Sequence, residues 1–566
     1  MSKLWKIVTL GVFSKTRRYD DIAPDEIFLD SSNLPQFDVY QFEGRMVKSI
    51  PRSSIYLLGG FFVIVVLVFL WRVSVLQIQD GATYAAQSEN NRLSHTNIFS
   101  GRGSIFDKNK KMLVWNVPND THDFALRSYV ATSGFAHVLG YIKYPQTDNS
   151  GNYYETEYVG NTGVEKTYND ILNGKNGLKI VETDALMDTM SESVIEPPIN
   201  GEDITLTIDA RVQEKLFGLI KDLTFEKGFS SGSGIIMDVN TGEIITLVSY
   251  PEYDLNVLVE GTDEETIVGY SVDEKKPYFN RAISGRYTPG SIVKPFVALG
   301  ALNEGVISPD KKILSTGSIS IPNRWNPELN TVFNDWKAHG WVDVKDALAV
   351  SSNVYFYEVG GGFEDQSGIG IRNIEKYMRM FGIGEISNID IPGEEEGVIP
   401  NPEWKEDNFD GEVWRVGDTY NTAIGQYGFQ VTLVQMVRAV GAIATNGLLT
   451  TPHVGNREVE TKKITEVGQQ HFEVVKTGMR QAVTAGTAAG LNVPQVKVAA
   501  KTGTAEVGIS NKNVNSWIVG FFPYDNPKYS FVIMMEKGPR DNTIGGLYVM
   551  RQLLDWMPTG APEYLK

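Results

Sequence analysis

Residues 234–248 read GIIMDVNTGEIITLV, and this stretch decides the fold. Two runs rich in Ile and Val, 234–239 and 243–248, are separated by the turn-forming triplet Asn240-Thr241-Gly242. Two β-prone runs across a short Asn/Gly turn are the pattern of a β-hairpin. The sequence therefore predicts that a sheet begins here.

Outward from the hairpin, helical and strand-like patterns alternate along the chain. Apolar residues recur at helical spacing, then at strand spacing, and again at helical spacing near the end. The expected segments are helices at 292–304, 432–445 and 545–556 and strands at 516–522 and 529–536. Strands near both ends of a region with helices between them predict an α+β or three-layer α/β/α domain with a mainly antiparallel sheet.

A segment of another kind lies upstream. Residues 53–71, SSIYLLGGFFVIVVLVFLW, contain no charged side chain. As a helix they would extend about 28 Å, close to the thickness of a hydrocarbon core. A buried core helix would have one polar face, and the charged region of a cleaved signal peptide would be much shorter than the 52 residues that precede this run. We expect a single transmembrane helix.

Basic residues flank this helix unevenly. Arg45, Lys48 and Arg52 precede it, whereas only Arg72 follows it closely. The positive-inside bias then places the N-terminus in the cytoplasm and the rest of the chain outside. We expect a cytoplasmic tail at 1–52, the helix at 53–71, and two outer domains at 72–200 and 201–566.

Composition narrows the chemistry that the chain can perform. It has 566 residues, a formal net charge of −17, six histidines and no cysteine. An acidic chain is a poor ligand for nucleic acid, and the lack of cysteine excludes disulfides, thiolate nucleophiles and Cys-ligated metals. No two histidines have the i, i+4 spacing of a helical metal site. We expect neither a metal nor a cofactor, so the chemistry must depend on hydroxyls, amines and carboxylates.

The first motif that carries such groups is Ser291-Ile292-Val293-Lys294. The turn Pro289-Gly290 precedes it and an apolar run follows. A helix places residues three apart on one face, and Ser291 would lie at the helix N-terminus, where backbone N–H groups are unpaired. The second Ser-x-x-Lys match, at 308–311, lies in a loop context, and we discard it.

Two further motifs follow along the chain. Ser351-Ser352-Asn353 lies between an apolar and an aromatic run, and a buried polar triplet needs hydrogen-bond partners. Lys501-Thr502-Gly503-Thr504 continues a strand-like run, where glycine permits a ligand backbone to approach closely. The similar triplets at 31–33 and 476–478 lie in the tail and in a helix-like stretch. We take 351–353 and 501–504 as candidate site segments.

A serine one helical turn from a lysine has the elements of a nucleophile and its base. A free lysine has a pKa of about 10.4 and is almost fully charged at neutral pH. Burial and a second nearby cation lower the pKa of a lysine. We therefore predict that Lys294 activates Ser291 and that Lys501 supplies the second positive charge.

These three motifs together resemble those of penicillin-binding proteins and serine β-lactamases. The whole region after the anchor is similar to a class B penicillin-binding protein, a monofunctional peptidoglycan D,D-transpeptidase with a pedestal domain. Segments 355–357, 417–419, 423–426 and 486–488 resemble the elongation, or rod-shape, branch. Tyr427 departs from the glycine usual in that branch. The resembling pedestal segments are RGSIFD at 102–107, HVLGY at 137–141 and GVEKTY at 163–168.

The resemblance implies a role for each candidate residue. Ser291 would attack the penultimate D-Ala of a stem peptide, with the N–H groups of Ser291 and Thr504 as the oxyanion hole. Ser351 would relay a proton, and Asn353 would bind the substrate amide. The strand from Lys501 through Thr502 and Gly503 to Thr504 would hold the terminal carboxylate. β-Lactams would acylate the same serine.

The resemblance also implies partners and leaves alternatives open. It implies a SEDS-type glycan polymerase and other cell-elongation proteins as partners at a cell membrane. A membrane-anchored β-lactamase would share the motifs but hydrolyse its acyl-enzyme. A non-catalytic cell-wall scaffold would have no reason to keep Ser291, Lys294, Ser351, Asn353 and Lys501 together.

Overall fold

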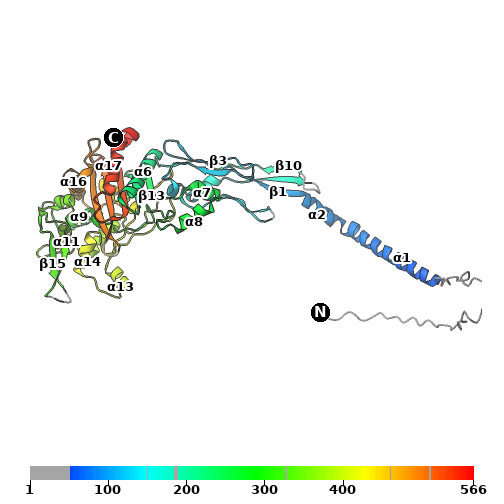
Figure 1. Ribbon diagram of the computed structural model, residues 1–566, viewed down its shortest axis with the longest axis horizontal. Helices are drawn as coiled ribbons and strands as arrows, with labels where there is room; N and C mark the ends of the chain where they lie inside the picture. Colours follow the sequence, from blue (N-terminus) through cyan, green and yellow to red (C-terminus); the bar gives the residue numbers. More distant parts are fainter. Residues whose placement is uncertain are drawn as a thin grey trace, which may run out of the picture. The chain divides into compact units, whose positions relative to one another are not determined.

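The computed structural model describes residues 51–149, 151–183, 189–323, 326, 328–458, 460–508 and 512–566. The expected tail at 1–52 and its 31–33 triplet fall almost entirely outside these residues. The chain divides into two compact units, with the division between Asn91 and Arg92. Figure 1 colours both units along the sequence.

The first unit contains the apolar helix predicted at 53–71. Helix α1 spans Arg52–Ser74 and continues through a π-helical turn at Val75–Gln79; α2 follows at Gly81–Arg92. No residue of α1 is buried. Among the described residues, this is the one helix whose length and composition suit a membrane span. A fully exposed Ile/Val/Leu/Phe helix does not have the packing of a soluble core helix, which supports a membrane anchor.

The second unit is organised on a five-stranded antiparallel sheet. The predicted hairpin is present as β12 and β13, with Ile235 opposite Leu247. The predicted C-terminal strands are β21 and β22, and β22 pairs with β12, so the two ends of the domain meet at the middle of the sheet. The strand order is β13 (Ile244–Tyr250), β12 (Ser231–Asp238), β22 (Tyr529–Pro539), β21 (Asn513–Phe522) and β20 (Ala499–Val507).

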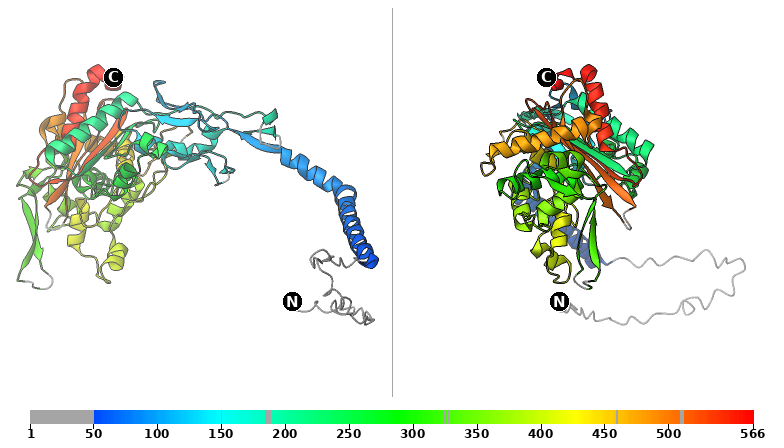
Figure 2. Two further views of the ribbon diagram at one scale, coloured as in Figure 1. Left: turned by 45° about the vertical axis from the view of Figure 1, so that its right-hand side comes forward. Right: turned by 90° about the vertical axis from the view of Figure 1, so that its left-hand side faces the viewer.

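Helices cover both faces of this sheet, as expected for three layers (Figures 1 and 2). α6 (Ala210–Lys227) and α17 (Gly546–Gly560) pack on one face, where Ile236 and Ile533 join their core. α9 (Lys294–Asn303) and α15 (Leu433–Ala444) belong to the core that contains Ile235 and Met534. Because side chains alternate along a strand, neighbouring residues enter different cores. This alternation produces the α/β/α arrangement.

The remaining elements of this domain lie between β13 and β20 in the chain. The helices are α7 (Leu255–Glu260), α8 (Glu264–Val272), α10 (Val344–Val350), α11 (Asn353–Gly361), α12 (Ile371–Met380), α13 (Pro402–Asn408), α14 (Val416–Ala423) and α16 (Gln469–Ala485). The short strands pair as β14 (Ile313–Ser315) with β17 (Gly340–Val342), β15 (Ser318–Pro322) with β16 (Asn330–Asn334), and β18 (Leu448–Thr450) with β19 (Thr461–Lys463).

The region before residue 200 contains small sheets and short helices. β1 (Leu93–Ile98), β9 (Gly177–Thr183) and β10 (Thr189–Glu196) form a three-stranded sheet. A second sheet has the order β11 (Ile204–Thr205), β2 (Ile105–Phe106), β3 (Met112–Val117) and β4 (Leu126–Tyr129). Strand β11 pairs with β2 although it lies after the predicted boundary at 200. This sheet therefore extends past that boundary. The other elements are α3 (Ala136–Leu139), α4 (Gly163–Thr167), α5 (Asn169–Asn173), β5 (Ile142–Lys143), β6 (Gln146–Thr147), β7 (Tyr153–Glu155) and β8 (Val159–Gly160).

A buried charge cluster holds this region together. The Glu165 carboxylate accepts hydrogen bonds from Arg102 Nε at 2.7 Å and Arg127 Nε at 2.8 Å. The side chains of all three residues are completely buried. Arg102 Nη1 also donates to Asn173 Oδ1 at 2.6 Å. The cluster joins the segments 102–107 and 163–168, and this contact gives the two resembling motifs a structural role.

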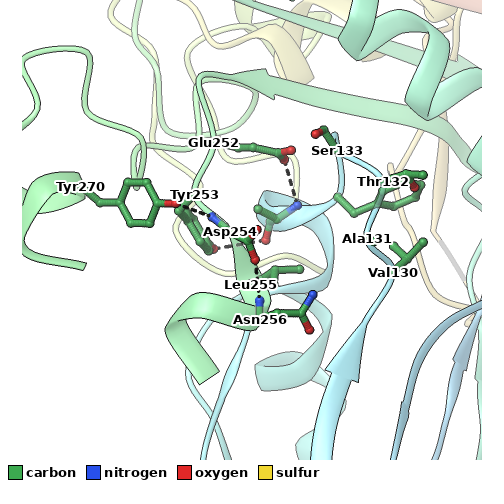
Figure 3. A pocket seen from close by; sticks show the side chains of 12 residues that line it. Val130, Ala131, Thr132, Ser133, Glu252, Tyr253, Asp254, Leu255, Asn256 and Tyr270 are labelled. Atoms are coloured by element: carbon green, nitrogen blue, oxygen red, sulfur yellow. Dashed lines mark hydrogen bonds between the residues drawn. The ribbon is translucent and has the colours of Figure 1, made fainter. Parts of the chain in front are cut away.

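Figure 3 shows a cavity of about 190 Å³ between the 130–136 loop and residues 252–256. The carboxylate of Glu252 accepts hydrogen bonds from the backbone N–H groups of Gly134 and Ala136 across this contact. Burial raises the pKa of Glu252 to about 7, although these two bonds lower it. Glu252 thus connects the loop that precedes α3 to the strand end at β13.

This pKa predicts a pH-dependent stability. The folded state holds the Glu252 proton more tightly than the unfolded state, whose pKa is near 4.5, so the stabilising contribution is complete below pH 4.5 and is lost as pH rises through 7. We expect Glu252→Gln to reduce the fall in melting temperature of the detergent-solubilised chain between pH 4.5 and 7.5 by a few degrees. Glu260→Gln, at an exposed position, is the control. Equal pH slopes for the wild type and Glu252→Gln would contradict the assignment.

Candidate active site

Ser291 lies in a tight turn at the entrance of a buried helix. Gly290–Val293 form a single 3₁₀ turn, and α9 begins directly afterwards at Lys294, with Pro295 in its first turn. Proline is tolerated there because the first N–H groups of a helix have no intrahelical partner. Gly290 has a φ of +58°, a conformation that favours glycine. Ser291 is the second residue of this turn and is half-buried.

Segments distant in the sequence clamp this turn. Gly290 N–H donates to Gly425 O at 2.9 Å, and Tyr287 exchanges two backbone hydrogen bonds with Val431. A Cβ on Gly425 would lie 2.2 Å from Gly290 O, so only glycine allows the approach. Trp517 Nε1 donates to Thr288 O at 3.1 Å from the central sheet. These contacts fix the backbone on which Ser291 is carried.

The strand of the third motif packs directly against the same turn. A Cβ on Gly503 would lie 2.8 Å from Ile292 Cγ2 and 3.0 Å from Pro289 O. A Cβ on Gly290 would lie 2.8 Å from Thr504 O. Gly503 therefore permits close approach, but the group that approaches is the protein's own turn that carries Ser291. The contact places Thr504 beside the turn that holds Ser291.

The Lys294 amine is completely buried and faces the second motif. Its Nζ donates to Ser351 O at 2.8 Å and to Asn353 Oδ1 at 2.7 Å, and lies 3.5 Å from Ser351 Oγ. Among the described residues, Ser291 Oγ has no hydrogen-bond partner, so no direct hydrogen bond joins Ser291 in the turn to Lys294 at the start of α9. Catalytic hydrogen bonds are often long in unliganded sites and shorten with substrate.

Ser351 links the two lysines. Lys501 Nζ donates to Ser351 Oγ at 2.7 Å and to Thr502 O at 2.8 Å. Ser351 ends helix α10 with a φ of +58°, and α11 begins two residues later at Asn353. This break between the helices turns the Ser351 carbonyl and hydroxyl toward Lys294. The structure therefore brings all three motifs together.

Burial controls the charge of both lysines. It lowers the pKa of Lys294 to about 7, against the opposing effect of the Asp335 carboxylate. The pKa of Lys501 is also well below its ordinary value, first because of burial and second because of the Lys294 charge. Two buried amines joined through one hydroxyl do not both keep a proton easily.

The threonines of the third motif lie on the outer side of β20. Thr502 is half-buried and Thr504 is exposed, whereas Lys501 and Gly503 are buried, as strand alternation requires. Thr502 Oγ1 donates to Thr487 Oγ1 at 2.7 Å. Thr487 belongs to the segment 486–488 that the resemblance singled out without assigning it to the site. Its hydroxyl extends the polar surface beside Lys501.

Sequence reasoning missed Asp335, which lies in the loop after β16. Its Oδ2 accepts hydrogen bonds from Ser352 Oγ at 2.8 Å, Asn353 N at 2.7 Å and Val354 N at 3.0 Å. The Asp335 side chain is completely buried. No local pattern marks this residue, because the loop and the helix it contacts are separate in sequence. In the described part of the chain, no three His, Asp or Glu side chains converge as metal ligands.

The discarded motifs lie in ordinary structural positions. Ser308 is exposed in a turn, where its carbonyl accepts from Lys311 N at 3.1 Å. Lys476 lies within α16 and pairs with Glu473 at 2.6 Å. Tyr427 has a φ of +63° and packs in an aromatic cluster with Trp404, Phe409 and Trp414. This packing explains how the loop after Gly425 accommodates a large side chain where the resembling branch has glycine.

The fold and this arrangement of motifs match known families. The penicillin-binding protein transpeptidase domain model matches residues 232–550, and the penicillin-binding protein dimerisation domain model matches residues 120–206. The chain therefore belongs to the penicillin-binding protein transpeptidase family.

Several of the similar proteins carry the names MrdA or PBP2. Peptidoglycan D,D-transpeptidase MrdA of Escherichia coli is 30% identical over 473 residues, which cover 77% of this chain and 71% of that protein. MrdA of Acinetobacter baumannii is 30% identical over 71% of this chain, but the match spans only 62% of that relative's length. The solved complex of PBP2 with MreC from Helicobacter pylori aligns with a TM-score of 0.69 at 28% identity, over 83% of this chain and 99% of that one.

Proposed function

We propose that this chain is an elongation-type peptidoglycan D,D-transpeptidase that works through an acyl-enzyme on Ser291. The observation that carries the proposal is the convergence of Lys294, Ser351, Asn353 and Lys501 beside the Ser291 turn. The 30% identity to MrdA over most of the chain supports the elongation branch. The coarser classification, a penicillin-binding protein, already implies covalent inhibition by β-lactams at the same serine.

The geometry supports Lys294 as the base. A neutral amine has two N–H groups and one lone pair. Both N–H groups are used, in the bonds to Ser351 O and Asn353 Oδ1. The lone pair is then left for the Ser291 proton, and a pKa of about 7 leaves much of the amine neutral at physiological pH. A pKa close to the working pH suits a group that must both accept and return a proton.

The reaction then balances in two stages. Ser291 Oγ bonds to the carbonyl carbon of the penultimate D-Ala while its proton passes to Lys294, and the C–N bond breaks as the leaving D-Ala amine receives a proton through Ser351. An amine of a neighbouring strand next attacks the ester and loses its proton to Lys294, and Ser291 regains a proton as it leaves. Lys501, Thr502 and Thr504 hold the terminal carboxylate. The backbone N–H groups of Ser291 and Thr504 stabilise the oxyanion.

The experiment that tests this proposal is direct mapping of the acylated residue. The detergent-solubilised chain is incubated with penicillin, digested, and examined by tandem mass spectrometry. We expect the penicilloyl mass on the peptide that contains Ser291. An adduct on Ser308 or no adduct would overturn the proposal, and rapid release of the adduct would favour a β-lactamase.

The pKa of Lys294 predicts the pH dependence of acylation. Below about pH 7 the amine is protonated and cannot accept the Ser291 proton, so the second-order rate of labelling by a fluorescent penicillin should fall about tenfold for each further pH unit. Above pH 7 the rate should level off. The measurement is a stopped-time labelling series from pH 5 to 8.5. A rate that stays constant across this range would exclude a base with this pKa.

We also propose the membrane orientation and the partners. The basic residues before the apolar helix support a cytoplasmic N-terminus with the catalytic domain outside. The relative in the Helicobacter pylori complex binds MreC, and we extend to this chain an association with cell-elongation proteins, including a SEDS-type polymerase. Strand β10 supports this because Met190, Val194 and Ile195 are exposed apolar residues. Co-purification through residues 53–200 tests the association, and its absence in native membranes would contradict it.

A further inference from the structure

The first turn of α11 is held by a buried carboxylate from another segment. Asp335 Oδ2 accepts hydrogen bonds from the backbone N–H groups of Asn353 and Val354, the first two residues of that helix. Such N–H groups have no partner within the helix. A carboxylate is favoured there both as an acceptor and by the positive end of the helix dipole. Asp335 therefore caps α11 from outside the helix.

Two serines complete this cap. Ser352 Oγ donates to Asp335 Oδ2 at 2.8 Å, and Ser315 Oγ lies 3.3 Å from the same oxygen and 3.0 Å from Ser352 Oγ. Both serines are completely buried. The other carboxylate oxygen accepts from Trp336 N at 2.8 Å. A fully hydrogen-bonded buried network of this kind holds its members in one geometry.

The capped turn carries the groups that orient the proposed base. Asn353 Oδ1 and Ser351 O, which accept the two short hydrogen bonds from Lys294, flank Ser352 in the chain. A shift of this turn would move both acceptors and thereby the Lys294 amine. Among the described residues, no hydrogen bond or ion pair joins Asp335 to Lys294, so Asp335 would act through Ser352 and Asn353.

We propose that Asp335, supported by Ser315 and Ser352, is a positioning residue that sets the orientation of the Lys294 amine toward Ser291. This inference rests on the proposed function of Ser291 and Lys294. It gives Asp335, which belongs to none of the three motifs, a role in orienting the proposed base. The task depends on the negative charge of Asp335 as well as on its hydrogen bonds.

The negative charge of Asp335 predicts a change in the pH profile of acylation that a purely structural role would not cause. The titratable groups that interact with Lys294 are Lys501 on β20 and Asp335 and His339 on the loop after β16. Lys337, on the same loop, acts on His339. Burial lowers the pKa of His339, so this histidine is neutral at physiological pH. Asp335 is thus the nearby anion that favours the protonated form of Lys294. Its removal should lower the pKa of Lys294 and move the rising limb of the acylation profile to lower pH.

The test compares acylation by a fluorescent penicillin in full-length Asp335→Asn and wild-type chains from pH 5 to 8.5. We expect the plateau rate to fall at least tenfold and the rising limb to move to lower pH. Asp310→Asn is the matched control, because the Asp310 side chain is 90% exposed and pairs only at 3.5 Å with Lys345. The control should have the plateau rate and the rising limb of the wild type.

Two further variants separate the possible failures. Ser352→Ala removes the hydrogen bonds of Ser352 Oγ with Asp335 Oδ2, Ser315 Oγ and Tyr355 N without a change in charge. It should lower the plateau rate several-fold with the rising limb unmoved, and it also serves as the test if Asp335→Asn does not fold. The inference would be overturned if Asp335→Asn kept both the plateau rate and the rising limb of the wild type. It would also be overturned if Ser352→Ala kept the wild-type plateau rate. A reduced plateau with an unmoved limb in Asp335→Asn would show a structural role alone and overturn it as well. Labelling that survives in Ser291→Ala would instead refute the proposed function.

Discussion

Ser291→Ala is expected to abolish covalent labelling by a fluorescent penicillin, with a loss of at least about 10⁴-fold in the acylation rate. Loss of a nucleophile cannot be compensated by the remaining groups, because Lys294 and Lys501 have no other hydroxyl at the turn to activate. Ser351 Oγ already accepts a hydrogen bond from Lys501 Nζ at 2.7 Å and belongs to another segment, the end of α10. The measurement is in-gel fluorescence after timed exposure.

The matched control uses the second copy of the motif. Ser308→Ala removes an exposed hydroxyl from a Ser-x-x-Lys sequence that lies in a turn. It should label at the wild-type rate. If Ser308→Ala lost labelling while Ser291→Ala kept it, the assignment of the nucleophile would be reversed. Both variants change only one oxygen atom, so a folding defect is not expected to separate them.

Glu165→Ala is expected to destabilise the region before residue 200 by about 3–5 kcal/mol. The substitution leaves Arg102 and Arg127 as buried cations without their shared carboxylate. Removal of one partner from a buried ion cluster costs far more than the cluster contributes, since the remaining charge cannot be solvated. Hydrogen–deuterium exchange of segments 93–149 and 160–183 in the full chain measures the effect. We expect a large rise in exchange there.

An exposed ion pair in the same region provides the control. Glu192 lies on β10 and pairs with Lys179 at 3.1 Å, and its side chain is 51% exposed. Glu192→Ala makes the same change in charge but should cost only about 0–1 kcal/mol. Similar exchange in the two variants would show that the buried cluster does not stabilise this region more than a surface pair.

Local sequence patterns predicted the framework of the molecule. The hairpin at 234–248, the C-terminal strands and the helix around 432–445 are present with shifts of a few residues at their ends. These elements follow from side-chain periodicity, which is set by neighbours in the sequence. The apolar run at 53–71 predicted its helix for the same reason. Residue context also distinguishes the Ser-x-x-Lys match at 291–294, which enters a buried helix, from the match at 308–311, which lies in a turn.

Tertiary contacts decided which groups surround each candidate site residue. Gly503 was expected to make room for a ligand, yet it faces Ile292 and Pro289 of the turn that carries Ser291. Asp335 reaches the start of α11 from a separate loop, and no pattern within either segment indicates this contact. The Glu165 cluster likewise joins motifs that are 63 residues apart.

The amino-acid sequence by itself determined the long apolar helix, the antiparallel framework and the polar groups of the three motifs. These depend on the residue types and on their spacing along the chain. Only the tertiary structure decided that Ser351 joins Lys294 to Lys501 and that burial brings the pKa of Lys294 to about 7. The physical reason is that desolvation and hydrogen bonding depend on which atoms surround a group, and folding brings those atoms from segments as far as 150 residues away.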